Sequence, residues 1–307
     1  MKISDGFWLN KPGYSVNYAT QMYTVEADDS SVTVYATNQW IGNRGMTLGG
    51  PMLTIRFSST LKNSIKVDID HFKGANKKSP EFTLYEDSSF KPAVKKNEDG
   101  SYELISGDTR VKIGGQGSGW DVTYWYKDRL LTKTGWRTTS LIEEEEWLTK
   151  NKRIAQDGQR FFAQSDNGET SYIREMLGIS IGEYIYGFGE KFSTFVKNGQ
   201  TVDVWNNDGG TCSEQSYKSI PFFVSSRGYG VFVNHPENVT FEVASETVSK
   251  TAFSVQGQHT EYFLFGGETV ADVLTSYTDL TGKPALPPAY TFGLWLSTSF
   301  TTSYNEE

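Results

Sequence analysis

The feature that most constrains this chain is a series of short segments in which apolar and polar residues alternate. The alternation is clearest over residues 32–34, 53–57, 65–69 and 122–126. Successive side chains of a strand point to opposite faces, so each segment gathers its apolar residues on one face. Clusters of Gly, Asn, Asp and Ser, such as residues 97–101 and 167–168, lie between such segments and favour tight turns. The pattern predicts antiparallel hairpins of half-buried strands.

The clearest hairpin covers residues 220–233. Its strand-like halves, Ile220–Val224 and Tyr229–Val233, flank a turn that ends at Gly228, and Gly-containing turns of this length commonly join antiparallel strands. A second pair covers residues 239–243 and 251–255. Helical periodicity is almost absent before residue 265. The sequence therefore predicts an all-β fold, a large antiparallel β-sandwich of two packed sheets.

The pattern changes toward the far end of the chain. Apolar residues recur there at helical spacing between Gly267 and Gly282, which predicts one short amphipathic helix; they are Val270, Val273, Leu274, Tyr277 and Leu280. The next segment, Lys283–Ala289, contains three prolines, which fix φ and withhold hydrogen-bond donors. We expect an extended linker, and a boundary between a domain at 1–282 and a second unit at 283–307.

The segment Tyr290–Leu296 is a nearly continuous apolar run, typical of a strand buried on both faces. We expect Trp295 in this strand to pack in a core. A single strand cannot satisfy its own hydrogen-bond ladder, and only 11 residues follow it. The sequence therefore predicts that the chain is truncated, by design or by proteolysis, and that a longer protein supplies the partner strands.

Composition and charge exclude several classes of partner. The formal net charge is −8, whereas binding to a phosphate backbone requires clustered Lys and Arg. No apolar stretch approaches the roughly 18 residues that span a bilayer, and the N-terminus lacks the apolar core of a signal peptide. The single Cys212 cannot form an internal disulfide. We expect a soluble, cytoplasmic protein that binds neither nucleic acid nor membrane.

Other motifs favour ordinary structural roles. The Gly-rich segment Gly114–Gly119 lacks the following helix that would bind a phosphate, so we expect a hairpin loop. The run Glu143–Glu146 is typical of a solvated face. His71, His235 and His259 are widely separated and lack metal-ligand spacing. The sequence predicts no metal and no cofactor.

Two segments carry a specific resemblance. Residues 186–192 read Tyr-Gly-Phe-Gly-Glu-Lys-Phe, and residues 204–210 read Val-Trp-Asn-Asn-Asp-Gly-Gly. The first resembles the Tyr-Gly-Leu-Gly-Glu block in the N-terminal β-sandwich domain of glycoside hydrolase family 31. The second resembles that family's Trp-Asn-x-Asp loop. The resemblance implies a galactose mutarotase-like sandwich.

The resemblance extends over nearly the whole chain. Residues 218–222 and 227–235 are similar to the family's next hairpin, and Phe292–Phe300 resembles the first strand of its catalytic (β/α)8 barrel and the following loop. The opening residues 2–8 and the loop at 208–215 resemble the α-xylosidase branch more than α-glucosidases. We therefore expect the sandwich, the linker and the start of a truncated barrel.

The resemblance implies a retaining mechanism, which requires two carboxyl groups about 5 to 5.5 Å apart. In the family both are Asp residues on later barrel strands, which these 307 residues do not include. Neither Glu190 nor Glu214 is assigned a catalytic role merely because the chain is rich in acids. We expect no catalytic residue in this chain, and no hydrolase activity from it alone.

The resemblance implies that the chain contributes to substrate binding. Asp208 could accept two hydrogen bonds from adjacent sugar hydroxyls, although an Asp in a turn more often caps its own loop. Trp205 would support that loop from below, and packing in a core is the favoured role for its ring. Phe300, in the loop after the first barrel strand, would either border the sugar's apolar face or pack in the barrel core.

Three hypotheses for function remain. The first is an α-xylosidase that removes terminal α-xylosyl units from xyloglucan-type oligosaccharides without a cofactor. The second is an α-glucosidase or transglycosidase of the same family, which differs in the pocket around the sugar's hydroxymethyl position. The third is a free-standing, lectin-like β-sandwich that binds sugar without catalysis. The sequence does not give the oligomeric state, and the sheet edges leave a homo-oligomer open.

Overall fold

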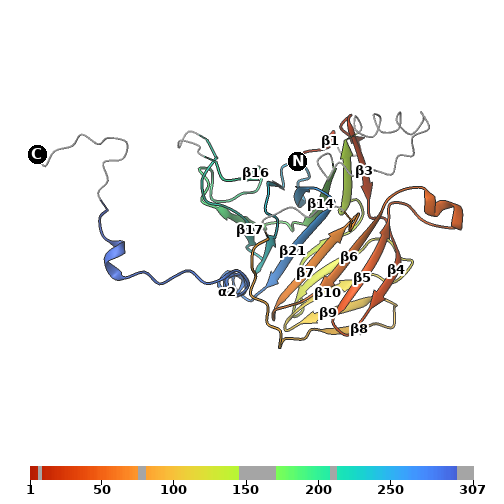
Figure 1. The fold of residues 1–307 in the computed structure, drawn as a ribbon, viewed down its shortest axis with the longest axis horizontal. Coiled ribbons are helices and arrows are strands. Elements are labelled where there is room, and N and C mark those ends of the chain that lie inside the picture. Colours follow the sequence, from red (N-terminus) through yellow and green to blue (C-terminus); the bar gives the residue numbers. More distant parts are fainter. Residues whose placement is uncertain (6–8, 75–80, 145–170, 208–212, 296–307) are drawn as a thin grey trace, which may run out of the picture.

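The computed structural model describes residues 1–5, 9–74, 81–144, 171–207 and 213–295. Their dominant elements are antiparallel strands, arranged in three large sheets and one small one (Figure 1). The prediction of an all-β antiparallel fold is confirmed. The predicted number of packed sheets is wrong, because three large sheets share the core where the sequence suggested two.

The largest sheet has eight strands and carries the segments that resemble the family. In spatial order they are β15 (Ile185–Gly189), β17 (Ser219–Ser225), β18 (Tyr229–Val233), β21 (His259–Gly266), β7 (Ser64–Asp70), β6 (Met52–Ser58), β5 (Ser31–Thr37) and β4 (Gln21–Ala27). The predicted hairpin is the pair β17 and β18, in which Phe223 lies opposite Val231.

The other sheets pack against this one. The six-stranded sheet runs β16 (Gln200–Val204), β19 (Val239–Val243), β20 (Lys250–Gln256), β14 (Ser171–Gly178), β13 (Ser140–Glu144) and β3 (Tyr14–Tyr18). The five-stranded sheet runs β12 (Arg129–Thr134), β11 (Val122–Tyr126), β10 (Thr109–Ile113), β9 (Tyr102–Ser106) and β8 (Ala93–Lys96), and the small sheet pairs β1 (Ser4–Asp5) with β2 (Leu9–Asn10). The second predicted hairpin is β19 with β20.

One continuous core joins the three large sheets. Its members come from the alternating segments, including Val34, Ile55 and Val67, all fully buried. Buried hydroxyls cross the layers as well, since Tyr124 of β11 and Tyr262 of β21 are hydrogen-bonded at 2.8 Å. Buried polar groups need such partners. The Gly-rich segment at 114–119 forms part of the connection between β10 and β11, as expected for a loop between antiparallel strands.

The predicted helix is α2 (Val270–Thr281), and it covers the outer face of the eight-stranded sheet. A capping box begins the helix: the Thr269 hydroxyl accepts from the backbone N–H of Asp272 at 3.2 Å, and the Asp272 carboxylate accepts from the backbone N–H of Thr269 at 2.9 Å. Val273 and Leu280 are buried against Phe222, Phe232 and the end of β21. The helix explains why β17, β18 and β21 are apolar on both faces.

The predicted barrel strand at Tyr290–Leu296 is wrong for the described residues. The chain from Lys283 to Pro288 is exposed and contains neither helix nor strand, and η2 (Ala289–Phe292), a short 3₁₀ helix, follows it. Trp295 is 72% exposed, so its predicted core packing is also wrong. A buried strand needs pairing partners and cover on both faces. In Figure 1 this segment instead runs away from the sandwich.

Candidate functional site

A groove of about 640 Å³ lies beside the end of β16, where two of the family-like segments meet. Trp205 and Asn206 form one wall, and the loop from Asn234 to Glu237 forms another. The remaining wall and floor come from Phe82, Thr83, Leu84, Ser219, Ile220, Pro221, Phe232, Tyr277 and Thr281. The volume is in the range of natural sites for small ligands. This groove is the candidate site.

The floor of the groove is aromatic. The Tyr277 ring, which lines the groove, stacks on the ring of buried Phe222 with centroids 3.9 Å apart and an interplanar angle of 9°. Phe232 meets the same Tyr277 edge to face at 5.5 Å. Burial raises the pKa of Tyr277 above the ordinary value for a phenol. Helix α2 thus fixes the floor of the groove from the outside of the sheet.

The Tyr-Gly-Phe-Gly-Glu segment forms a bulged strand that controls where β17 begins. The β15–β17 register shifts between Gly187 and Gly189, and both glycines have positive φ angles, 117° and 82°. A side chain on Gly189 would overlap the carbonyl oxygen of Lys218, and one on Gly187 would lie 2.7 Å from that of Phe222. Glycine is therefore required here by both conformation and space.

The bulge turns the residue between the two glycines into the core. Phe188 has a φ of 67°, an uncommon value for a bulky side chain. Its ring is fully buried, 4.7 Å from the ring of Phe241 and 5.9 Å from that of Phe223. Aromatic packing of this kind offsets the cost of the backbone conformation. The motif anchors the edge of the sheet next to the groove.

A hydrogen-bonded junction joins the family-like segments to one another. Lys191 Nζ donates to Ser219 Oγ at 2.6 Å and to the Asp203 carbonyl at 2.9 Å. Ser219 Oγ donates in turn to the Trp205 carbonyl at 3.2 Å, and the Ser219 N–H donates to Asn206 Oδ1 at 2.9 Å. Burial lowers the pKa of Lys191, although nearby Asp203 opposes that effect. The junction fixes the base of the loop that continues to Asp208.

Of the three predicted site residues, the structure describes Trp205. Trp205 borders the groove, but its ring is 52% exposed, so the predicted core packing is wrong. Its backbone carbonyl, which accepts from Ser219, is what ties it to the sheet. Asp208 and Phe300 lie outside the described residues, and their roles stay predictions.

The carboxylates near the groove do not form a hydrolytic pair. Glu237 is the only carboxylate among the described residues that line the groove. Glu190 forms an exposed ion pair with Lys218 at 3.1 Å, and such surface pairs contribute little. Retaining hydrolysis needs two adjacent carboxyl groups, and the described lining of the groove supplies one.

Sequence reasoning missed Lys191, Ser219 and Tyr277 as parts of this site. Lys191 and Ser219 are 28 positions apart and meet only through the pairing of β15 with β17. Tyr277 belongs to the apolar stripe of a helix, which predicts burial and gives no indication of a groove. The signal that could have located them is the bulged Gly-x-Gly strand end, because bulges often lie next to sites.

Comparisons with known proteins agree with this geometry. Residues 54–242 match the model of the glycosyl hydrolase 31 N-terminal galactose mutarotase-like domain. The whole chain aligns with the α-xylosidase XylQ of Lactiplantibacillus pentosus at 39% identity and with an α-xylosidase of Emericella nidulans at 36%. It spans 37% and 39% of the lengths of these two proteins.

A solved structure shows the same fold. The dextranase FjDex31A of Flavobacterium johnsoniae, complexed with glucose, superposes with a TM-score of 0.67 over 90% of this chain and 30% of its own, at 21% identity.

Across the described residues, no helix has the length and apolar character needed to cross a membrane.

Proposed function

Because this chain belongs to the N-terminal galactose mutarotase-like domain family of glycosyl hydrolase 31, we propose that it is the N-terminal part of a retaining α-xylosidase. The full enzyme would remove terminal α-xylosyl residues from xyloglucan-type oligosaccharides. The observation that carries the proposal is the alignment of two α-xylosidases with all of this chain, at 36% and 39% identity.

In this proposal the sandwich shapes one side of the substrate pocket. The junction at Ser219 holds the base of the Trp205–Asn206 segment, and Asp208, a few residues further on, accepts hydrogen bonds from sugar hydroxyls. Phe300 borders the apolar face of the sugar ring. The exposed ring of Trp205 extends the groove toward the substrate.

The chemistry itself comes from outside these 307 residues. We place the nucleophile and the acid/base on barrel strands of the longer protein, after a domain boundary at residues 282–283, and no cofactor takes part. The supporting observations are the single carboxylate lining the described groove and the share of its relatives that this chain spans. The chain alone should therefore release no p-nitrophenol from an α-xyloside, and measurable turnover would contradict this division of roles.

The substrate is tested by comparing kcat/KM of the full-length enzyme for p-nitrophenyl α-xyloside and p-nitrophenyl α-glucoside. The two sugars differ by a hydroxymethyl group, a difference for which a pocket discriminates by about 1–3 kcal/mol. We expect at least a tenfold preference for the xyloside. A preference for the glucoside would instead identify an α-glucosidase or transglycosidase of the same family. Sugar binding without hydrolysis of either compound would support the lectin-like alternative.

A further inference from the structure

The groove at Trp205 is lined by two asparagines whose amide groups are held in opposite orientations. Asn206 follows β16 of the six-stranded sheet, and Asn234 follows β18 of the eight-stranded sheet. An asparagine amide can both donate and accept, and its orientation is fixed by the partner that each half of the amide has in the protein. These partners therefore decide what each asparagine can offer to a ligand in the groove.

Asn206 offers hydrogen-bond donors. Its Oδ1 accepts from the backbone N–H of Ser219 at 2.9 Å. Because a backbone N–H can only donate, this bond fixes the amide with its oxygen toward β17. The side chain is exposed, and no described residue accepts from its Nδ2. Asn206 therefore keeps an N–H₂ group available for a ligand in the groove.

Asn234 offers an acceptor. Its Nδ2 donates to Glu261 Oε1 at 2.7 Å, and its backbone N–H donates to the Glu261 carbonyl at 2.9 Å. Burial opposes ionisation of Glu261, but the hydrogen bond and the charge of Lys66, 2.7 Å away, hold the pKa of that carboxyl below its ordinary value. An ionised carboxylate only accepts, so Asn234 must turn its N–H₂ group toward it. No described residue donates to Asn234 Oδ1, which is left for a ligand.

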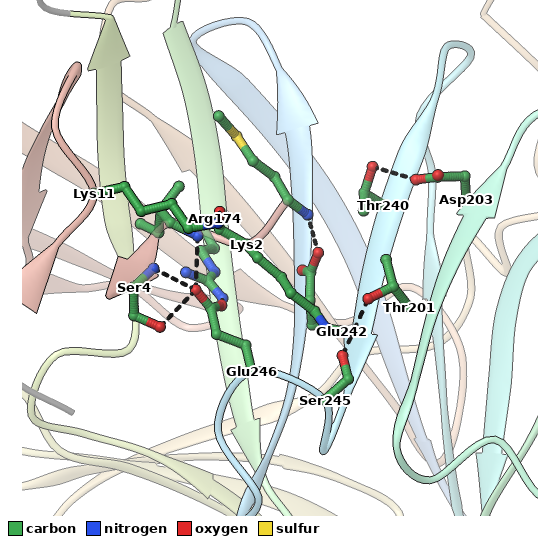
Figure 2. A network of polar contacts seen from close by, with 12 residues as sticks. Lys2, Ser4, Lys11, Arg174, Thr201, Asp203, Thr240, Glu242, Ser245 and Glu246 are labelled. Carbon is green, nitrogen blue, oxygen red and sulfur yellow. Dashed lines mark hydrogen bonds and ion pairs between the residues drawn. The ribbon is translucent and has the colours of Figure 1, made fainter. Parts of the chain in front are cut away.

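The rest of the lining suits a neutral ligand. Its described residues include neither lysine nor arginine, and Glu237 is the single carboxylate among them. Asp203 of β16 does not line the groove, because its carboxylate accepts from Thr240 Oγ1 at 2.8 Å on the neighbouring strand β19 (Figure 2). The exposed rings of Trp205 and Phe82 border the groove. Apolar rings and uncharged hydrogen-bonding groups therefore dominate this surface.

A saccharide matches these groups better than a charged ligand does. A sugar hydroxyl both donates and accepts, so one saccharide can bond an N–H₂ group and a carbonyl oxygen and can also lay an apolar ring face on an indole. A phosphorylated or carboxylated ligand would need basic side chains, which the described lining lacks. The groove therefore favours a neutral saccharide.

We propose that the groove binds a neutral glucan segment, with Asn206 donating to one sugar hydroxyl, Asn234 accepting from another, and Trp205 covering a ring face. The choice of a glucan rests on the proposed function, because the backbone that remains after a xyloglucan-type oligosaccharide loses its xylosyl units is a chain of glucosyl units. The two asparagines are distinct from Asp208 and Phe300, to which the resemblance assigned the substrate contacts.

The test is isothermal titration of the 307-residue chain with cellotetraose, which contains no xylosyl bond to hydrolyse. We expect cellotetraose to bind at least tenfold more tightly than tetragalacturonic acid or a neutral tetrapeptide, with an affinity that does not change as salt is raised. Absence of cellotetraose binding, or equal binding of either comparison ligand, would overturn the proposal. Hydrolysis by the full-length enzyme is a separate measurement, so a failure of the proposed function would appear there and not in this titration.

Variants of Asn206 separate contact with the ligand from support of the loop. Asn206→Ala should weaken cellotetraose binding at least fivefold. Asn43→Ala is the matched control and should leave binding unchanged, because Asn43 Oδ1 likewise accepts from a backbone N–H, that of Gly45 at 3.0 Å, but lies outside the groove. Asn206→Asp keeps an acceptor for the Ser219 N–H and lacks the N–H₂ group, so it should not restore binding. Wild-type affinity in Asn206→Asp would overturn the proposal, because it would show that Asn206 only holds the loop.

Asn234→Ala tests the acceptor on the other wall and should also weaken cellotetraose binding at least fivefold. Its matched control is Asn38→Ala, which removes an amide that donates to Asn17 Oδ1 at 3.0 Å outside the groove and should leave binding unchanged. Circular dichroism checks that each variant is folded. Unchanged binding in the folded Asn234→Ala protein would overturn the proposal.

Discussion

Gly189 lies where the backbone of β15 passes closest to the start of β17. Its φ of 82° and the adjacent Lys218 carbonyl oxygen exclude a side chain for two separate reasons. Gly182 provides a natural comparison, because its φ is 74° but no atom lies within 4 Å of the place a Cβ would take. The two positions separate the cost of conformation from the cost of overlap.

We expect Gly189→Ala to lower the free energy of unfolding by about 3 kcal/mol or more, measured by urea denaturation, because strain and overlap act together. Gly182→Ala should cost only about 1–2 kcal/mol, the ordinary cost of a left-handed conformation for a residue other than glycine. Equal effects at the two positions would contradict the close approach of β15 and β17.

Glu175 predicts a pH dependence of stability. It is buried on the inward face of β14, where it accepts from Thr139 Oγ1 at 2.7 Å and Thr134 Oγ1 at 2.8 Å. Burial raises its pKa from 4.5 to about 7, against the opposing effect of these hydrogen bonds. The folded chain therefore binds this proton more tightly than the unfolded chain. Its contribution is fully present below about pH 4.5 and is lost as the pH rises through about 7.

We expect Glu175→Gln to remove about 3 kcal/mol of the decline in unfolding free energy between pH 4.5 and pH 8, since one pKa unit corresponds to about 1.4 kcal/mol. Glu98→Gln, in the exposed turn between β8 and β9, is the matched control and should leave the decline unchanged. A Glu175→Gln profile parallel to that of the wild type would show that Glu175 does not hold its proton in the folded chain.

Sequence reasoning reached some residues of the site and missed others. The Trp205–Asn206 segment lines the groove, and the Gly-x-Gly segment forms the edge strand that pairs with β17. The burial of Trp205 was wrong, because ring size predicts packing only where neighbours enclose the ring. Lys191 and Ser219 are ordinary polar residues in the sequence, and only strand pairing brings them together.

At the scale of elements, the packing of helix α2 on the eight-stranded sheet can be tested directly by mutation. Its Tyr277 ring contacts Phe222, Phe232 and Phe265, whereas Leu274 on the same helix is 44% exposed. We expect Tyr277→Ala to lower the unfolding free energy by about 2 kcal/mol or more, and Leu274→Ala by less than about 1 kcal/mol. Urea denaturation measures both, and a larger loss for Leu274→Ala would place the wrong face of the helix on the sheet.

Local pattern predicted elements better than it predicted their partners. The hairpin β17–β18 and helix α2 follow from turn residues and periodicity within about 15 positions of one another. The pairing of β7 with β21, which sets Val67 opposite Tyr262, joins distant parts of the chain and has no local signal. The prediction of a strand at residues 290–296 was wrong although the local signal was present. The segment has the apolar composition of a strand, but no described neighbour pairs with it.

At the scale of the whole molecule, the groove takes its lining from two of the three large sheets and from helix α2. Val204 comes from β16, Ser219 from β17 and Tyr277 from α2, so the groove depends on how these elements pack together. The cytoplasmic setting stays a prediction from the sequence, which left the oligomeric state open.

The central claim is that this sandwich contributes a wall of the xyloside pocket, and Asp208→Ala in the full-length enzyme tests it most directly. We expect kcat/KM for p-nitrophenyl α-xyloside to fall at least tenfold, about 1.4 kcal/mol of lost transition-state stabilisation, with the urea midpoint unchanged. Asp128→Ala, in the exposed turn between β11 and β12, should change neither quantity. An Asp208→Ala enzyme with wild-type kcat/KM would contradict the claim.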